Sequence, residues 1–520
     1  MQHTTSIDRW RKTSVILSIA IFIAFLSFQF NDTDLYYLIA TGRYILQYKT
    51  VPHINPFCIT ENCGIVLQNW LYCVLVAFVY DHFYSAGLWL MQSLLLGVMY
   101  IVILAFLNYG SYKDRILSHL LTICTIVIFG YTNLRPEMLT FILVVTQILI
   151  IERYMKTSCK RLLYCLPLII LVEANMHASY LFIHFVILLP YCVPMIRNTV
   201  INDQSIPLEK MKEFVIPIVL MVFAMFVNPY GAKNAFYFLN ALRTRTLFVS
   251  GIGEHYAYAV DTPYAVVFLI MVCIFIACLI YRKLDSISFY MFVGFSFLFV
   301  LAAKWVIFFA LGCLYIFRIL AKIAHEKNIA LSNSPAFSRQ YTYGFTVLLG
   351  IGLAGILLCN IDIISNKYAS DYLTMNGPFI NSGIVQCVKY IKERNPRADV
   401  YTLYENNNYL QFCGFRTYTD ARPELYSPIF TGGADSIKNA LIIENGYNII
   451  DYSKNIIATP DLCDFDYSLS EYGSIVDSVD ADYYIVSEPQ NILLKLYLDS
   501  NEQYLLRYEC KNMLVYERAY

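Results

Sequence analysis

Two aspartates, Asp32 and Asp34, follow the first apolar stretch of the chain, in the sequence FQFNDTDLYYLIATGRYILQ (28–47). Carboxylates at this spacing could accept a proton from a reacting hydroxyl or bind a divalent cation together. The same D-x-D pattern is also typical of a helix cap or of a solvated turn. The choice between these interpretations depends on which other polar residues reach the same side of the molecule.

Several other polar residues stand at the ends of apolar stretches. NLRPEMLTF holds an Arg-Pro-Glu turn, and EANMHASY holds Glu173, an asparagine and a histidine. GIGEHYAY holds a glutamate and a histidine, and AAKWVIFF holds a single lysine. Ionisable groups at membrane depth are costly and usually face a cavity or a partner, so their convergence indicates a site. Each also has a structural explanation, because proline suits a first helical turn and a lysine can extend to the interface. The candidate site residues are Asp32, Asp34, Arg43, His53, Arg135, Glu137, Asn175, His177, Glu254, His255 and Lys304.

The composition is that of a polytopic membrane protein. Of the 520 residues, 58% are hydrophobic and 15% are charged, and the mean hydropathy is +0.52. The formal net charge is zero and no basic arm or zinc-finger spacing occurs, so nucleic acid is not an expected partner. Arg9, Arg11 and Lys12 precede an apolar run without a cleavage site, which predicts an uncleaved first span. Cys58 and Cys63 share one polar loop and could pair.

Basic residues orient the predicted spans, since short cytoplasmic loops collect lysine and arginine. If the apolar stretch 66–82 crossed the bilayer, the cluster at 153–161 and the later basic loops would lie outside. If 66–82 lies in the outer interface, every basic cluster falls in the cytoplasm. The second arrangement predicts about eleven spans, a cytoplasmic N-terminus and an external loop at 31–85 with interfacial helices. The predicted spans are 13–30, 86–109, 116–132, 138–152, 162–176, 179–196, 213–228, 264–280, 286–303, 305–321 and 342–360.

The pattern changes after residue 360. Short apolar segments alternate with polar turns, and YLLRYECKNMLVYER predicts a hairpin around Lys511 and Asn512. We therefore expect a transmembrane domain at 1–360 and a soluble α/β domain at 361–520, which the count of spans places outside the cytoplasm.

The ordered set of motifs resembles a family. An external acidic motif is followed by an aromatic pair and ATGRYI, then by PHINPF, NWLYCVLVAFVYDHF, RPE, NMHASY, NPYG and, in the tail, TDARPELY. This order is similar to that of bacterial integral-membrane glycosyltransferases of the GT-C superfamily. That superfamily also holds the protein O-mannosyltransferases and the lipid A aminoarabinose transferases. The likeness covers nearly the whole chain and lies closest to a large bacterial branch.

The resemblance implies an enzyme of the plasma membrane that transfers a sugar, with inversion, from a polyprenyl-phosphate-linked donor to an extracytoplasmic acceptor. Its catalytic acidic residue in the first external loop maps onto Asp32 or Asp34. Which carboxylate acts, and whether both bind a divalent cation such as Mg²⁺ or Mn²⁺, stays open. Arg135 and Lys304 are the counterparts of less regular donor-phosphate positions.

The residues suit this chemistry. Transfer to a hydroxyl needs a base, which one carboxylate can supply, and a departing lipid phosphate needs cations such as Arg43, Arg135 and Lys304. The candidates for substrate binding are His53, Glu137, Asn175, His177, Glu254 and His255. Two other function classes stay open: a transporter or flippase of lipid-linked or small substrates, and a non-catalytic membrane protein that binds glycans.

Overall fold

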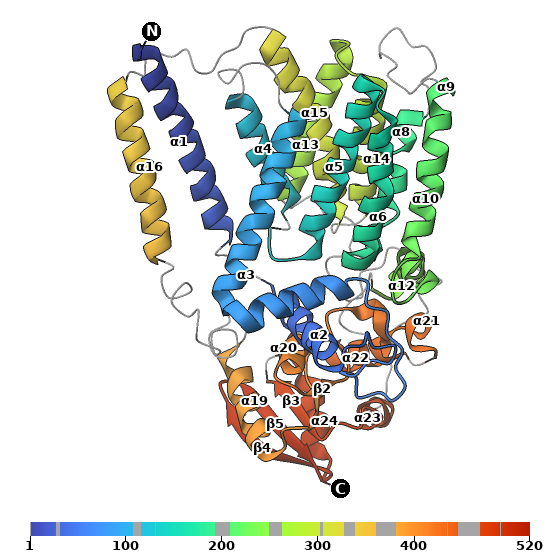
Figure 1. The fold of residues 1–520 in the computed structure, drawn as a ribbon. Helices are drawn as coiled ribbons and strands as arrows, with labels where there is room; N and C mark the ends of the chain where they lie inside the picture. The colour runs from blue at the N-terminus through green and yellow to red at the C-terminus, as the bar shows by residue number, and fades with distance from the viewer. Residues whose placement is uncertain are drawn as a thin grey trace. The chain divides into compact units, whose positions relative to one another are not determined.

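Figure 1 shows the fold in a computed structural model. The chain forms two compact units, each assembled from three separate segments. The first unit holds Met1–Phe30, Ala86–Asn228 and Glu254–Ser365, and the second holds Asn31–Ser85, Pro229–Gly253 and Asn366–Tyr520. The structure describes residues 2–27, 32–107, 116–130, 132–192, 208–248, 263–301, 305–326, 339–359, 381–433, 435–445, 469–488 and 490–519.

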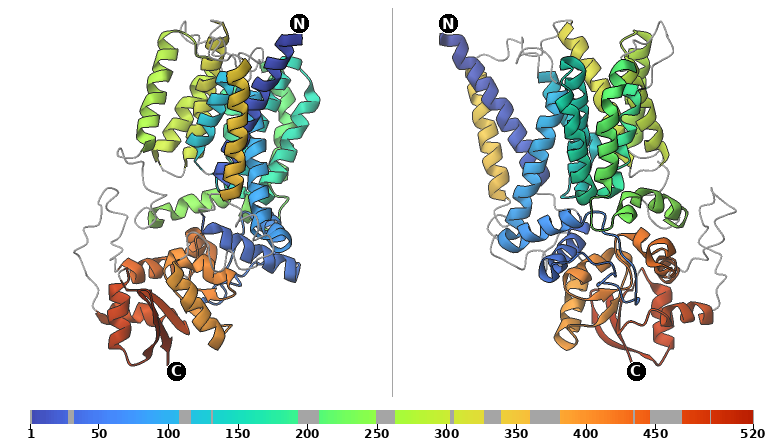
Figure 2. Two further views of the ribbon diagram at one scale, coloured as in Figure 1. Left: turned by 90° about the vertical axis from the view of Figure 1, so that its left-hand side faces the viewer. Right: turned by 45° about the vertical axis from the view of Figure 1, so that its right-hand side comes forward.

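The first unit is helical, as expected of apolar segments that must satisfy their backbone groups internally. Helix α1 packs along α16, where the hydroxyls of Ser14 and Thr346 lie 2.5 Å apart, and Figure 2 shows the two helices side by side. Helix α15 is the most buried, and its Phe309 ring stacks on Phe299 of α14 with centroids 4.7 Å apart. The helices are α1 (Gln2–Ser27), α3 (Trp70–Leu107), α4 (Ile116–Phe129), α5 (Pro136–Thr157), α6 (Cys165–Met176), α7 (Ile183–Val186), α8 (Leu189–Cys192), α9 (Leu208–Met211), α10 (Val215–Met225), α13 (Pro263–Ile280), α14 (Ser286–Leu301), α15 (Val306–Glu326) and α16 (Arg339–Cys359).

Helical structure occurs within each of the eleven predicted spans. In the segment predicted at 179–196, the described residues 179–192 form only short turns of helix. Among the described residues, three helices are long and apolar enough to cross a membrane: α3, α5 and α15. The chain is therefore a helical protein with membrane-spanning segments. The count of eleven spans stays a prediction.

Helix α3 is interrupted at Tyr84, whose φ of 51° and ψ of −149° are not helical. An unbroken helix of its 38 residues would be about 57 Å long, roughly twice the thickness of the hydrocarbon core. The interruption separates residues 70–83, which belong to the second unit, from residues 86–107, which belong to the first. This break lies where the sequence predicts the division between an interfacial stretch at 66–82 and a span at 86–109.

The second unit joins the predicted external loop to the C-terminal domain. Helix α2 (Asp34–Tyr48) packs against the first part of α3, and Gly42 allows the closest approach. A side chain at this position would place its Cβ 2.0 Å from the carbonyl oxygen of Cys73. The other helices of this unit are α11 (Ala232–Ala235), α12 (Tyr237–Phe248), α19 (Ser382–Arg394), α20 (Asn407–Phe412), α21 (Pro428–Thr431), α22 (Ser436–Asn445), α23 (Leu469–Asp477) and α24 (Ile492–Ser500).

A mixed five-stranded sheet forms the centre of the C-terminal domain, in the order β2-β1-β3-β5-β4. Strands β2, β1 and β3 run parallel, and β5 and β4 are antiparallel to their neighbours. Tyr401, Tyr484 and Val486 contribute to the hydrophobic core between sheet and helices. The sequence prediction of an α/β domain agrees with this architecture. The strands are β1 (Asp399–Tyr401), β2 (Arg416–Thr417), β3 (Tyr483–Ser487), β4 (Tyr504–Cys510) and β5 (Met513–Arg518).

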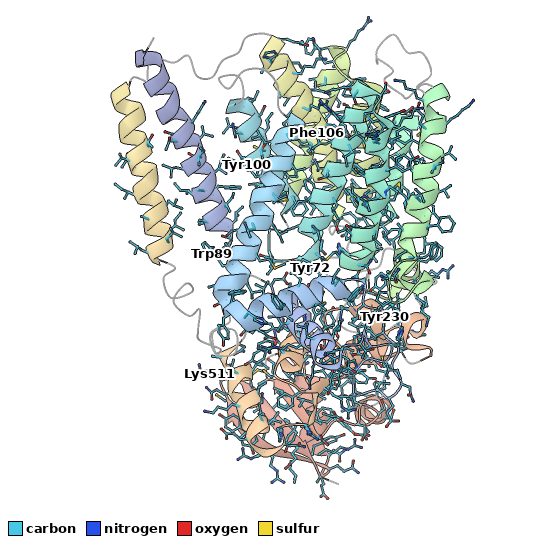
Figure 3. All side chains as sticks on the ribbon, viewed as in Figure 1. Tyr72, Trp89, Tyr100, Phe106, Tyr230 and Lys511 are labelled. Carbon is cyan, nitrogen blue, oxygen red and sulfur yellow. The ribbon has the colours of Figure 1, made fainter. Side chains whose placement is uncertain are left out.

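The predicted hairpin around Lys511 and Asn512 joins β4 to β5 in the structure. Both turn residues have positive φ, 51° and 65°, as a two-residue hairpin turn requires. The Lys511 ammonium donates to Ser382 Oγ at 2.8 Å and so fastens the turn to the start of α19 (Figure 3).

The stability of this domain should depend on pH because of Glu444, which lies near the end of α22. Burial raises the pKa of its carboxyl to about 8 from the usual 4.5, although the Tyr404 N–H donates to it. The folded protein therefore holds a proton that the unfolded chain has lost. Between about pH 4.5 and 8 the free energy of unfolding should fall as pH rises, by up to about 1.4 kcal/mol per pH unit. Thermal melts of Glu444→Gln should have a flatter pH profile, whereas Glu502→Gln, which removes an exposed carboxylate of the same domain, should retain the wild-type slope.

Candidate functional site

Asp32 and Asp34 form a turn at the start of α2, which we call the acidic turn (32–34). The Asp34 backbone N–H donates to Asp32 Oδ1 at 3.1 Å, so the Asp32 side chain satisfies the first N–H of α2, while Thr33 is the N-cap residue. Both side chains are half-buried. The capping interpretation of the D-x-D pattern thus applies to Asp32, and it leaves a chemical role for either carboxylate open.

Asn408 of α20 connects the acidic turn to the C-terminal domain. Its buried amide nitrogen lies 3.3 Å from the Thr33 carbonyl oxygen and 3.5 Å from Asp34 Oδ1. Its amide oxygen accepts the Ala421 N–H at 3.1 Å. One side chain therefore links the backbone of the acidic turn to the TDARPELY segment.

That segment contains a buried ion pair between Asp420 and Arg422. The Arg422 guanidinium donates to both carboxylate oxygens, at 3.0 and 2.5 Å, and the Tyr426 hydroxyl donates to Oδ2 at 2.7 Å. Asp420 is 0% exposed and Arg422 is 4% exposed. Burial alone would raise the pKa of Asp420, but the charge and hydrogen bonds of Arg422 hold it below its usual value. Both groups are therefore charged at neutral pH.

The Arg422 guanidinium also lies over the ring of Tyr37, 4.6 Å from its centroid. Tyr37 is one helical turn beyond Asp34 on α2, and its hydroxyl accepts the Asn69 amide at 3.2 Å. Arg422 therefore supports the turn of α2 that carries the acidic pair. Its Nη1 has no hydrogen-bond partner in the described part of the chain. Our candidate list misses Arg422 and Asn408, although TDARPELY is among the motifs that define the resemblance.

Two more candidates lie in the same unit. Arg43 donates to Asp81 Oδ1 from Nε at 2.8 Å and from Nη2 at 2.7 Å, and it lies over the rings of Tyr80 and Phe412. His53 packs edge-on against Tyr230 with centroids 5.1 Å apart. Arg43 therefore holds α2 against the first part of α3. If Arg43 also binds the donor phosphate, it must do so while paired with Asp81.

In the first unit, Glu137 and His177 belong to a network between α5, α6 and α7. His177 Nδ1 lies 2.8 Å from Thr140 Oγ1, which donates to Glu173 Oε1 at 2.6 Å. His177 Nε2 lies 3.2 Å from Ser179 Oγ and 3.9 Å from Glu137 Oε1. Two predicted site residues therefore meet around a buried carboxylate, Glu173, that the candidate list misses.

His184 extends this network. Gln147 donates to the His184 carbonyl oxygen and accepts from His184 Nδ1 at 2.6 Å, which directs the Nε2 of His184 toward Glu173 Oε2 at 3.8 Å. The E-x-x-x-H spacing of Glu173 and His177 on one helical face is the sequence signal for this cluster.

Two of the remaining candidates, Arg135 and Asn175, lie among the described residues. Asn175 donates to the carbonyl oxygens of Leu171 and Val227, and Arg135 is the residue before α5. These two residues lie in the first unit, apart from the unit that holds the acidic turn. Lys304, Glu254 and His255 lie outside the described residues. The proposed convergence of all candidates thus stays a prediction.

Metal binding and thiol pairing were also expected possibilities. Among the described residues, no group of three His, Cys, Asp or Glu side chains is placed to hold a metal ion. Cys58 and Cys63 are buried free thiols within hydrogen-bonding reach of one another. Their proximity lowers the pKa of Cys58 and raises that of Cys63.

Comparisons with known proteins identify a fold. No protein-family profile matches the chain, and no curated protein matches it in sequence. The structure is similar to the crystal structure of the Archaeoglobus fulgidus oligosaccharyltransferase in the apo form. The TM-score is 0.54 at 10% identity, and the match covers 91% of this chain and 69% of that chain. The chain therefore shares the fold of this oligosaccharyltransferase, and the bacterial branch suggested by the sequence stays a prediction.

Proposed function

We propose that the protein is a membrane glycosyltransferase that moves a sugar from a polyprenyl-phosphate-linked donor to an extracytoplasmic acceptor. The main support is the acidic turn, held on α2 by Asn408 in a chain with the fold of an oligosaccharyltransferase. In this proposal the N-terminus is cytoplasmic and the unit with the acidic turn lies outside. The acceptor is a glycan, lipid or protein of the cell surface.

The proposed reaction is a single displacement. The carboxylate of Asp32 or Asp34 accepts the proton of the acceptor hydroxyl as its oxygen forms a bond to the anomeric carbon. The bond from that carbon to the donor phosphate breaks, the phosphate keeps the electron pair, and the configuration inverts. Arg43, Arg135 and Lys304 are the proposed cations for the departing phosphate. The proposed substrate-binding residues are His53, Glu137, Asn175, His177, Glu254 and His255.

The acidic turn could hold a divalent cation if the donor also supplied ligands. The carboxylates of Asp32 and Asp34 are oxygen ligands of the kind that Mg²⁺ and Mn²⁺ prefer. Since no third acidic or histidine ligand joins them among the described residues, the donor phosphates would have to complete the coordination. Such an ion would neutralise charge on the leaving phosphate.

The proposal predicts that removal of the protein causes a polyprenyl-phosphate-linked sugar to accumulate. Mass spectrometry of extracted lipids identifies that donor, and the purified protein should then transfer its sugar in an assay run with and without EDTA. A transporter or flippase would move the lipid-linked sugar without forming a covalent product. A non-catalytic glycan-binding protein would bind the sugar without cleaving its bond to the donor phosphate. Transport without a covalent product, or binding without cleavage, would each exclude the transferase.

A further inference from the structure

A pocket of about 240 Å³ opens between helices of the first unit, and we call it the basic pocket. It lies at the C-terminal ends of α5 and α15 and at the N-terminal end of α14, with Tyr191 of α8 also in its wall. The sequence predicts that these helix ends face the cytoplasm, because basic clusters occur at 153–161, 282–283 and 318–339. The acidic turn belongs to the other unit, so the basic pocket is a separate feature.

The lining of the basic pocket carries excess positive charge. Four basic side chains face two carboxylates, which leaves a formal charge of +2. Arg318 forms an ion pair with Glu152 and lies over the ring of Phe106, which Figure 3 labels on the last turn of α3. The basic residues are Lys156, Lys283, Arg318 and Lys322, and the acidic residues are Glu152 and Asp285.

The second carboxylate does not neutralise the lysines. Asp285 caps α14, since Oδ1 accepts the Ser288 N–H at 2.8 Å and Oδ2 accepts its hydroxyl at 2.9 Å. Lys283 lies 3.4 Å from Glu326, which is outside the pocket lining. Within the described ranges, Lys156 and Lys322 form no ion pair, and both are exposed. Two lysines, one from α5 and one from α15, are therefore available at the same opening.

The tyrosines add a neutral hydrogen-bonding surface. The buried hydroxyls of Tyr191 and Tyr315 lie 3.1 Å apart in the pocket wall. A phosphate group offers several acceptor oxygens, which suit two ammonium groups and a hydroxyl better than a single carboxylate would. At about 240 Å³ the pocket is smaller than a site for a drug-sized molecule, and its size fits a headgroup.

Lysines that only extend to the interface would give a different arrangement. Such side chains spread around the helix ends and need no shared cavity. Here the cations converge on one pocket from two helices, α5 and α15, and from the loop that joins α13 to α14. One of them, Arg318, is fixed by both a carboxylate and an aromatic ring. Basic pockets between transmembrane helices on the cytoplasmic side are suited to anionic headgroups.

We propose that the basic pocket binds a phosphate group through Lys156 and Lys322, and that an anionic phospholipid of the inner leaflet supplies it. The lipid tails would lie along the apolar surfaces of α5 and α14. This site is independent of sugar transfer, so the failure of either proposal leaves the other in place.

Native mass spectrometry of the full-length chain in detergent tests the site with phosphatidylglycerol, phosphatidylcholine and inorganic phosphate as probes. The wild type should retain phosphatidylglycerol in preference to phosphatidylcholine. Lys156→Gln with Lys322→Gln should weaken phosphatidylglycerol binding on the order of 30-fold, at about tenfold or less per surface lysine. Since both residues are exposed, we expect the variant to fold, which size-exclusion elution checks.

A matched control removes two positive charges from the same predicted face but outside the pocket, with Arg153→Gln and Arg282→Gln. The control should change phosphatidylglycerol affinity by less than about threefold, because charge outside the pocket acts only through screened, long-range attraction. Equal losses in the two double variants, or equal binding of both lipids, would overturn the proposal. If millimolar inorganic phosphate displaced phosphatidylglycerol from the wild type and bound equally tightly, the ligand would be free phosphate, and the lipid source would be excluded.

Discussion

Replacing the acidic-turn carboxylates one at a time is expected to reduce sugar transfer by at least about 100-fold in at least one of Asp32→Asn and Asp34→Asn. A positioned general base contributes about 10²–10⁴ to the rate, and an amide cannot accept the proton. Asparagine has the same shape as aspartate and keeps an oxygen that can accept a hydrogen bond. We therefore expect the start of α2 to persist, at a cost of about 0.3–1 kcal/mol from the lost charge at the helix dipole.

The measurement is transfer from the polyprenyl-linked donor by purified variants at matched concentration. Glu61→Gln is the control, because Glu61 is an exposed carboxylate of the same predicted external loop. This control should retain near wild-type activity. Wild-type rates in both aspartate variants would remove the acidic turn from the mechanism. A comparable loss in Glu61→Gln would point to loop charge in general rather than to a base.

Replacing Arg422 with methionine is expected to lower the free energy of unfolding by about 3–5 kcal/mol, because the change leaves the Asp420 carboxylate buried without its partner. Asp420 is 0% exposed, so water cannot compensate for the loss. The effect should appear as a lower midpoint in thermal or urea unfolding of the detergent-purified chain. Asp420→Asn combined with Arg422→Met should recover part of the loss, since that double variant leaves no unpaired charge in the interior.

Arg416 offers a matched comparison within the same domain. It forms a two-point ion pair with Asp399 at 2.7 and 2.5 Å, but its side chain is 51% exposed. Arg416→Gln should therefore cost only about 0–1 kcal/mol. If Arg422→Met were no more destabilising than Arg416→Gln, the buried pair would not support the turn of α2 beside it.

The sequence predicts local features well where one physical rule dominates. The apolar stretches of the membrane half predict where its helices occur, because backbone polar groups in lipid must be satisfied within a helix. The hairpin at Lys511 and Asn512 is confirmed, since a lysine–asparagine pair between two apolar alternations leaves little choice of turn. The separation of 66–82 from 86–109 agrees with the break at Tyr84.

Contacts between distant segments could not be predicted in the same way. The pairing of Asn408 with the acidic turn spans more than 370 residues, and neither residue pattern specifies its partner. Glu173 and His184 meet because α6 and α7 are arranged around Thr140 and Gln147, and a single sequence does not encode that arrangement locally. Arg422 lies in a noted motif, but burial, which gives it its role, depends on the tertiary fold.

The second unit is built from stretches that leave the ribosome at very different times. Residues 31–85 emerge early, whereas Asn408 and Arg422, which support the acidic turn, emerge only near the end of synthesis. Pairings this remote in the chain are slow to form, because a long loop must close before any contact is gained. Until translation is nearly complete, α2 lacks the contacts with Asn408 and Arg422. A nascent or truncated chain that ends before residue 381 would therefore contain both aspartates but none of the C-terminal residues that support them.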